Sequence, residues 1–363
     1  MATTYETPAT SLYTHDAYKV SVDEYMAFRR NGFLVVRGLV SPEEVQELKS
    51  HTDDLMQGKL PEQQSATLDG PHSGPSGTTV QALAAPPPHL SPEEKADYFL
   101  RLHMLHRQLE LHERYLLHPR VLDVLQALIG PDLLALQTML FLKGPGKPGQ
   151  GWHQDTYYIP THPDSLCGAW IAIDDCDEQN GALWYAKGSQ HEPVYPPTSG
   201  YGFGDHLLGG VSSIAGASNP DDSQNDLTKI ANRYDHILVA AQPGDVVFFG
   251  GHVLHRSKKN WSTDRFRRSF VGHYCNARSF TQWGREHGED VDGSDLGSNQ
   301  FHILARGDTH LPFAKPRFGT FCAALLDPDQ RKHESEFAAM MMGDMESGMM
   351  GASAADPTLE DDD

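Results

Sequence analysis

The sequence has few cysteines, and none is placed as a redox or metal-binding pair. Cys167, Cys176, Cys275 and Cys322 are the four in a chain of 363 residues, and no two have the Cys-x-x-Cys spacing. The first 19 residues contain no apolar core stretch of the kind that a secretory signal needs. We therefore expect a cytoplasmic protein whose reduced cysteines are buried for packing.

Long apolar runs and an excess of positive charge are also absent. No run of about 18 apolar residues suggests a membrane-spanning helix. Lysine and arginine total 29 against 49 aspartates and glutamates, and the formal net charge is −20. Nucleic acids and anionic membranes would repel such a surface on average, so we expect a small-molecule partner. No pattern indicates an oligomeric state.

The first part of the chain has helix-start chemistry at three serines. Ser21, Ser41 and Ser91 are each followed three residues later by glutamate, as in a capping box. The predicted helices cover residues 22–31, 42–56, 92–117 and 119–129, with a strand at 33–36. Residues 1–20 are expected to be a flexible leader. Residues 57–92, rich in Pro, Gly, Ser and Gln, are expected to form a mobile loop.

From Leu133 onward the pattern changes to short strands separated by turn residues. The predicted strands are 136–143, 168–174, 183–186, 237–240, 246–250 and 267–275, with weaker pieces such as 317–323. Many short strands after helices predict a mainly β fold with flanking helices, a jelly roll, as a single domain over residues 21–330. Residues 191–235 look like a long insertion, and the acidic, Met-rich tail 340–363 is expected to be disordered.

A candidate metal site begins at His153-Gln154-Asp155. In an extended strand, residues i and i+2 point to the same face, so His153 and Asp155 can converge on one ion. His255 follows a later apolar strand and offers a second imidazole. Two histidines and one carboxylate form the facial triad of non-haem Fe(II) oxygenases, which leaves positions open for an oxoacid and dioxygen (O2).

Other histidines compete for these roles. His252 lies three residues before His255 and would point to the opposite face of a strand. His103 and His106 are expected on an exposed or partly packed helix face. His191 is expected in a surface loop. His273 either lines the barrel or simply fills a strand position.

A cationic anchor for the far carboxylate of 2-oxoglutarate is expected one strand beyond the distal histidine. Arg267 lies there, twelve residues after His255. A guanidinium suits a carboxylate because it donates two parallel charge-assisted hydrogen bonds. Arg267 and Arg268 point to opposite faces of the strand, and alternation alone does not say which face is inward.

The motifs together resemble the phytanoyl-CoA dioxygenase family over roughly residues 24–278. The matching positions are His153-Gln154-Asp155, Trp170, Asn180-Gly181, Gly188-Ser189-Gln190-His191, Pro243-Gly244-Asp245, His255-Arg256-Ser257, Asn260 and Arg267. The resemblance implies a double-stranded β-helix, Fe(II), and 2-oxoglutarate decarboxylation coupled to C–H hydroxylation. It also favours Arg267 over Arg268 as the oxoacid anchor.

The resemblance further implies roles for residues around the metal motif. Met139, Lys143 and Trp170 would contact the cosubstrate, Ser257 would lie near its distal carboxylate, and Gln137 would contact cosubstrate or substrate.

Because the carboxylate ligand Asp155 is present, we expect hydroxylation or a related oxidation rather than halogenation. The substrate is expected to be a small molecule or acyl-type compound, although no clear basic patch for a CoA phosphate is evident. The alternative is a non-catalytic β-sandwich whose metal is structural or sensory.

Overall fold

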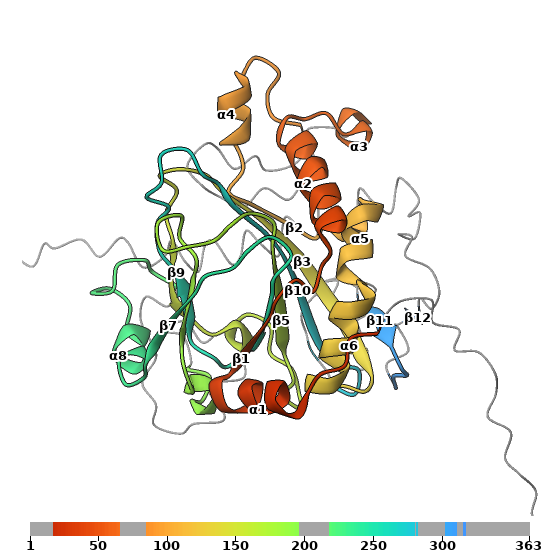
Figure 1. Ribbon diagram of the computed structural model, residues 1–363, viewed down its shortest axis with the longest axis vertical. Helices are drawn as coiled ribbons and strands as arrows, with labels where there is room; N and C mark the ends of the chain where they lie inside the picture. Colours follow the sequence, from red (N-terminus) through yellow and green to blue (C-terminus); the bar gives the residue numbers. More distant parts are fainter. Residues whose placement is uncertain are drawn as a thin grey trace, which may run out of the picture.

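Two antiparallel β-sheets form the body of the molecule, and helices cover the outer face of the larger one (Figure 1). The computed structural model describes residues 17–65, 85–195, 218–279, 281, 302–310 and 315–316. Within these ranges the two-sheet arrangement confirms the predicted jelly roll with flanking helices.

The larger sheet carries the inner wall of the fold. Its strand order is β1 (Phe33–Val36), β8 (Val246–Gly250), β5 (Cys167–Ala172), β10 (Arg267–Asn276), β3 (Leu133–Lys143), β11 (Ile303–Arg306) and β12 (Lys315–Pro316), and β2 (Arg101–His103) also pairs with β3. Cys167 lies on β5 and Cys275 on β10, and Cys176 follows the end of β5. All three are buried free thiols.

The smaller sheet faces the larger one across the pocket described below. Its order is β4 (Gln150–His153), β9 (His255–Ser257), β6 (Leu183–Ala186) and β7 (His236–Val239). Strand β4 pairs with β9 so that His153 and His255 are direct partners. This pairing joins segments about one hundred residues apart in the sequence.

Four of the α-helices, α1, α2, α4 and α6, begin where the sequence predicts. The described helices are α1 (Val22–Asn31), α2 (Pro42–Met56), α3 (Pro61–Ser65), α4 (Pro92–Ala96), α5 (Glu110–Leu116), α6 (Pro119–Leu128) and α8 (Leu227–Ala231), with 3-10 turns η1 (Leu105–Arg107), η2 (Asp155–Tyr157) and η3 (Ser189–His191). Ser21, Ser41 and Ser91 each form the complete capping box. Helix α1 ends at Gly32, whose φ of 86° is the left-handed conformation that glycine adopts without strain.

The main core lies between the larger sheet and the helices α2, α5 and α6, which lie together on one side in Figure 1. Alternation along β10 sends Phe270 into this core and Val271 into the apolar cluster on the opposite face. Neighbouring residues of this strand therefore point in opposite directions, one into the helix-covered core and the next into the interior between the sheets.

The prediction of one helix over residues 92–117 is wrong. Helix α4 ends at Ala96, residues 101–103 form the strand β2, and helix α5 begins only at Glu110. Strand β2 pairs antiparallel with β3, with His103 opposite Met139. Pairing with the sheet overrides the local helical preference, which is a weak determinant beside tertiary hydrogen bonding.

The predicted segment boundaries are covered only in part by the described residues. Most of the leader, the middle of the 57–92 loop and of the 191–235 insertion, the 317–323 piece and the 340–363 tail, like Cys322, lie outside them. Helix α3 lies within the predicted loop, and helix α8 lies within the predicted insertion.

Arg268 stabilises the fold through carboxylates on the helix-covered side. Its Nε and one terminal nitrogen lie 2.7 and 2.8 Å from the two oxygens of Asp174, and the other terminal nitrogen contacts Asp53. We expect Arg268→Met to lower the free energy of unfolding by roughly 3 kcal/mol, because Asp174 would lose its main partner while still largely buried. Denaturant unfolding measures this loss.

A matched control for that measurement is Arg265→Met. Arg265 forms a similar pair with Asp177, but both side chains are more than a third exposed. Exposed pairs contribute at most about 1 kcal/mol. Equal destabilisation by the two substitutions would contradict the structural role of Arg268.

Candidate active site

Three side chains with metal-binding atoms meet between the two sheets. His153 ends β4, His255 begins β9, and Asp155 begins the 3-10 turn η2. Gln154, which lies between His153 and Asp155, is extended, with φ −122° and ψ 128°. The side chains of its two neighbours therefore point to the same side of the backbone. Gln154 itself points away and donates its amide to the carbonyl of His252.

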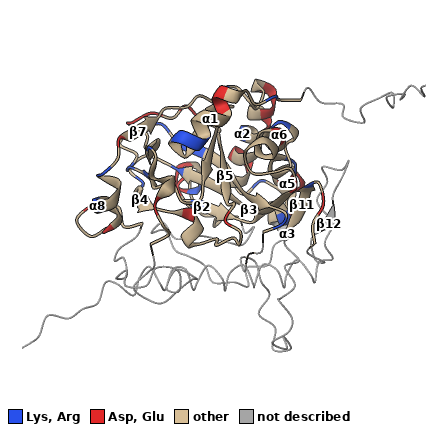
Figure 2. Cartoon of the chain, turned by 90° about the horizontal axis from the view of Figure 1, so that it is seen from below, with Lys and Arg blue, Asp and Glu red and all other residues tan. Residues whose placement is uncertain are grey.

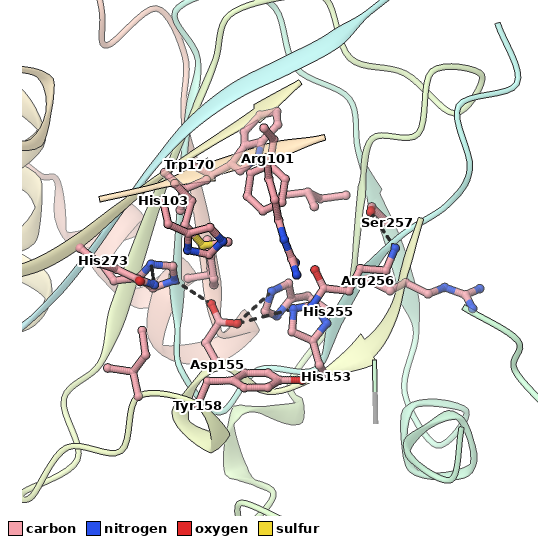
Figure 3. A pocket seen from close by; sticks show the side chains of 18 of the residues that line it. Arg101, His103, His153, Asp155, Tyr158, Trp170, His255, Arg256, Ser257 and His273 are labelled. Carbon is pink, nitrogen blue, oxygen red and sulfur yellow. Dashed lines mark hydrogen bonds and ion pairs between the residues drawn. The ribbon is translucent and has the colours of Figure 1, made fainter. Parts of the chain in front are cut away.

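The geometry of this cluster suits one divalent ion. Asp155 Oδ1 lies 3.5 Å from Nε2 of His153 and 3.6 Å from Nε2 of His255. The three candidate ligand atoms lie within 4.8 Å of one another, and all three residues are buried (Figure 3). Two imidazole nitrogens and one carboxylate form an incomplete ligand set, which leaves coordination positions for other molecules.

Hydrogen bonds orient both imidazoles. Nδ1 of His153 lies 2.8 Å from the carbonyl of Gly151, and Nδ1 of His255 lies 3.1 Å from the carbonyl of Val253. Each Nδ1–H donates to its carbonyl, so each Nε2 is left with a free lone pair toward the cluster. Burial and the neighbouring His255 lower the pKa of His153 to about 3, which keeps it neutral, as a metal ligand must be.

The second oxygen of Asp155 is held by a histidine whose role the sequence left open. His273 Nε2 lies 2.9 Å from Asp155 Oδ2, and the Gln137 amide nitrogen lies 3.1 Å from His273 Nδ1. Burial raises the pKa of Asp155, but the surrounding histidines lower it more, so the carboxyl stays ionised. The sequence signal that placed His273 at the pocket was the alternation along β10, because His273 lies on the same face of this strand as Arg267.

We expect His273→Leu to weaken Fe(II) binding by about 10–100-fold, since partners that orient a ligand have effects of this size. Anaerobic titration with Fe(II) measures the change. His191→Leu is the matched control, because His191 is exposed on the turn η3, outside the pocket. Unchanged iron affinity in His273→Leu would contradict the orienting role.

Arg267 points into the same pocket. It is 2% exposed, and one of its terminal nitrogens donates to the hydroxyl of Ser269 at 3.2 Å. No carboxylate in the described ranges forms an ion pair with it, and its Nε is buried without a partner. Arg268 lies on the opposite face with Asp174 and Asp53. A buried guanidinium without a protein acid has the chemistry to bind an external carboxylate.

The other predicted cosubstrate residues gather around Arg267. Met139, Trp170 and Ser257 line the pocket. Trp170 lies beside Val271 in the sheet, and its indole N–H is buried without a partner. Lys143 is paired with Arg267 across the β3–β10 ladder, but its amine contacts Ser257 and does not line the pocket.

The competing histidines lie in different places. His252 is outside the pocket, where its Nε2 lies 3.1 Å from Asp164. The expectation for His103 and His106 is wrong, because both are buried and neither lies on an α-helix. His103 lines the pocket from β2, together with Arg101, which sequence reasoning missed (Figure 3). The prediction of one helix over residues 92–117 gave no sign that either residue lies at the pocket.

The residues present fit iron and an anionic oxoacid. The open set of two histidines and one aspartate suits Fe(II) chemistry. Among the described residues, the Nε of Arg267 and the indole N–H of Trp170 are buried donors without acceptors, as an anionic ligand would require. The part of the chain that the structure describes contains no helix long and apolar enough to cross a membrane.

Comparison with known proteins identifies the family. The model of the phytanoyl-CoA dioxygenase (PhyH) family matches residues 28–269. The peroxisomal phytanoyl-CoA dioxygenase of Rattus norvegicus is 26% identical over 268 residues, covering 72% of this chain and 70% of that protein. Phytanoyl-CoA dioxygenase domain-containing protein 1 of Danio rerio is 24% identical, covering 71% of this chain and 91% of that protein.

Solved structures show the same fold. EctD from S. alaskensis, with 2-oxoglutarate and 5-hydroxyectoine, has a TM-score of 0.51 at 18% identity, covering 84% of this chain and 90% of that one. The epimerase SnoN, with Fe3+, alpha ketoglutarate and nogalamycin RO, has a TM-score of 0.51 at 17% identity, covering 76% and 93%. The family match spans more than half of the chain, and the enzyme prediction is confirmed. The chain therefore belongs to the phytanoyl-CoA dioxygenase family and is an Fe(II)- and 2-oxoglutarate-dependent dioxygenase.

Proposed function

We propose that the protein hydroxylates a small-molecule or acyl-type substrate and releases succinate and CO2. The observation that carries this proposal is the carboxylate of Asp155 beside two histidines, in a pocket that also contains Arg267, which forms no ion pair with any described carboxylate. A site without that carboxylate would leave room for a halide on iron. With it present, the expected outcome is transfer of oxygen to a C–H bond.

Each site residue has a distinct part in this proposal. His153, Asp155 and His255 would hold Fe(II), and His273 would orient the aspartate. Arg267 would anchor the distal carboxylate of 2-oxoglutarate. Bound Fe(II) supplies the coupling of 2-oxoglutarate decarboxylation to substrate oxidation. The chain itself binds, orients and excludes water.

The remaining lining of the pocket suits a substrate with both apolar and polar parts. Phe141, Phe249 and Val271 give it apolar walls, while Arg101 and Gln150 lie among the polar lining residues. Figure 2 shows both basic and acidic segments distributed over several of the described elements. A compact polar molecule or a free acid therefore fits better than a CoA thioester, whose phosphates need concentrated positive charge.

The test is succinate release by Fe(II)-loaded protein under air with 2-oxoglutarate. Pairs of free acids and their CoA thioesters are compared, and stimulation above the substrate-free rate identifies the productive class. The product is then examined by mass spectrometry for one added oxygen atom. A product that contains chlorine, or one that lacks added oxygen, would contradict hydroxylation.

We also propose the cytoplasm as the compartment of the protein. The support is the set of buried free thiols, Cys167, Cys176 and Cys275. The rat relative is named as peroxisomal, so cell fractionation with peroxisomal and cytosolic markers is the appropriate test. Co-purification with peroxisomes would contradict the proposal.

A further inference from the structure

Lys143 has a buried amine that contacts a pocket-lining residue without itself lining the pocket. Its side chain extends from the end of β3 and is 3% exposed. The amine donates to the Ser257 hydroxyl at 2.9 Å and to the carbonyl of Lys258 at 2.8 Å. No carboxylate in the described ranges pairs with it. Burial and the neighbouring Arg267 lower its pKa, yet both amine forms carry enough N–H groups for these two bonds.

The two contacts of Ser257 determine what its hydroxyl can do. Its oxygen accepts from the Lys143 amine and, at 3.3 Å, from the backbone N–H of Gln150. A hydroxyl oxygen has two lone pairs and one O–H. With both lone pairs used, Ser257 can act toward the pocket only as a donor, and it is among the residues that line this pocket.

The surrounding backbone is built to keep Lys143 in this place. The Asn260 side chain, fully buried, donates to the Lys143 carbonyl at 3.2 Å and to the Arg265 carbonyl at 2.7 Å. Gly181 adopts φ +81°, and a Cβ there would lie 2.5 Å from the Lys258 carbonyl and 3.2 Å from the Lys143 amine. A side chain at position 181 would therefore displace the partners of Lys143.

We propose that Lys143 is a positioning residue that fixes the Ser257 hydroxyl as a hydrogen-bond donor, so that Ser257 and Arg267 together bind the distal carboxylate of 2-oxoglutarate. This inference rests on the proposed function and adds to it the basis of cosubstrate selection. Lys143 does not touch the cosubstrate in this arrangement. It excludes the hydroxyl rotamer in which Ser257 would present a lone pair to the carboxylate.

The test compares two oxoacids that differ only at the far end. 2-Oxoglutarate carries the distal carboxylate, and 2-oxopentanoate has the same five carbons without it. Binding to the Fe(II)-loaded protein is followed anaerobically by the charge-transfer absorbance of the chelated oxoacid. We expect Lys143→Met to weaken 2-oxoglutarate binding about tenfold or more, as for a lost hydrogen bond to a charged group, and to leave 2-oxopentanoate binding unchanged.

Further variants distinguish a positioning role of Lys143 from a general loss of structure in the pocket. Lys143→Arg, which retains donors, should restore much of the preference for 2-oxoglutarate. Lys143→Met should have little further effect in a Ser257→Ala background, because the role acts through that hydroxyl. Lys187→Met is the control, since Lys187 is an exposed lysine after strand β6.

Two outcomes would overturn the role of Lys143. One is an equal loss of affinity for both oxoacids, and the other is full additivity with Ser257→Ala. A wild-type protein that binds neither oxoacid in the presence of Fe(II) would contradict the proposed function itself, and this role with it.

Discussion

His255→Ala should abolish iron binding and reduce 2-oxoglutarate turnover below detection. The substitution removes one of three ligands, and Asp155 would keep His153 as its only neighbour within the candidate ligand set. The expected loss of iron affinity is larger than the roughly 10–100-fold loss caused by removing a residue that only orients a ligand. Anaerobic Fe(II) titration followed by metal analysis of the desalted protein measures it.

His252→Ala is the control for that experiment. His252 is three residues away and partly buried, but it contacts Asp164 and the Glu192 carbonyl instead of the pocket. Iron content and turnover should stay near wild type. If His252→Ala lost iron while His255→Ala retained it, the ligand assignment would have to be exchanged.

Arg267→Ala should weaken 2-oxoglutarate binding by about 30-fold to several thousand-fold. Removing one side of a buried, hydrogen-bonded charge pair costs about 2–5 kcal/mol, and about 1.4 kcal/mol corresponds to tenfold in affinity. The large range reflects how much water replaces the guanidinium in the pocket. Iron binding should be unaffected, so the measurement is the oxoacid dissociation constant of the Fe(II)-loaded variant.

Two further arginine variants sharpen this prediction. Arg267→Lys should restore only part of the affinity, because an ammonium cannot donate the paired hydrogen bonds of a guanidinium. Arg268→Met should unfold more easily, yet its folded fraction should bind 2-oxoglutarate like wild type, because Arg268 contacts Asp174 on the other face. Weakened oxoacid binding in Arg268→Met alone would reverse the assignment of the two arginines.

Local signals predicted most of the elements and the nearest pair of candidate ligands. The three serine–glutamate pairs are followed by helices because the capping hydrogen bonds involve residues only three apart. His153 and Asp155 converge because one extended residue between them suffices. His255 is predicted from its place after an apolar strand, and the family resemblance supports it over His252, but no local rule brings it to the other two ligands.

The errors arose where a distant strand decides the structure. Residues 101–103 have helix-start chemistry upstream, but pairing with β3 makes them a strand and brings Arg101 and His103 to the pocket. The role of His273 likewise depends on Asp155, which is more than one hundred residues away and 2.9 Å from it in space. Alternation along β10 gives the face on which His273 lies, but it does not give the distant residue that His273 contacts.

The sequence alone determined the helix starts after Ser21, Ser41 and Ser91, the strand-rich second half and the close approach of His153 and Asp155, because each depends on residues within about one turn or two strand positions. Only the tertiary structure decided that His255 meets them, that Arg267 and not Arg268 faces inward, and that Lys143 contacts Ser257. These outcomes depend on strand register and on which sheet face is covered by helices. Both are properties of packing between distant segments.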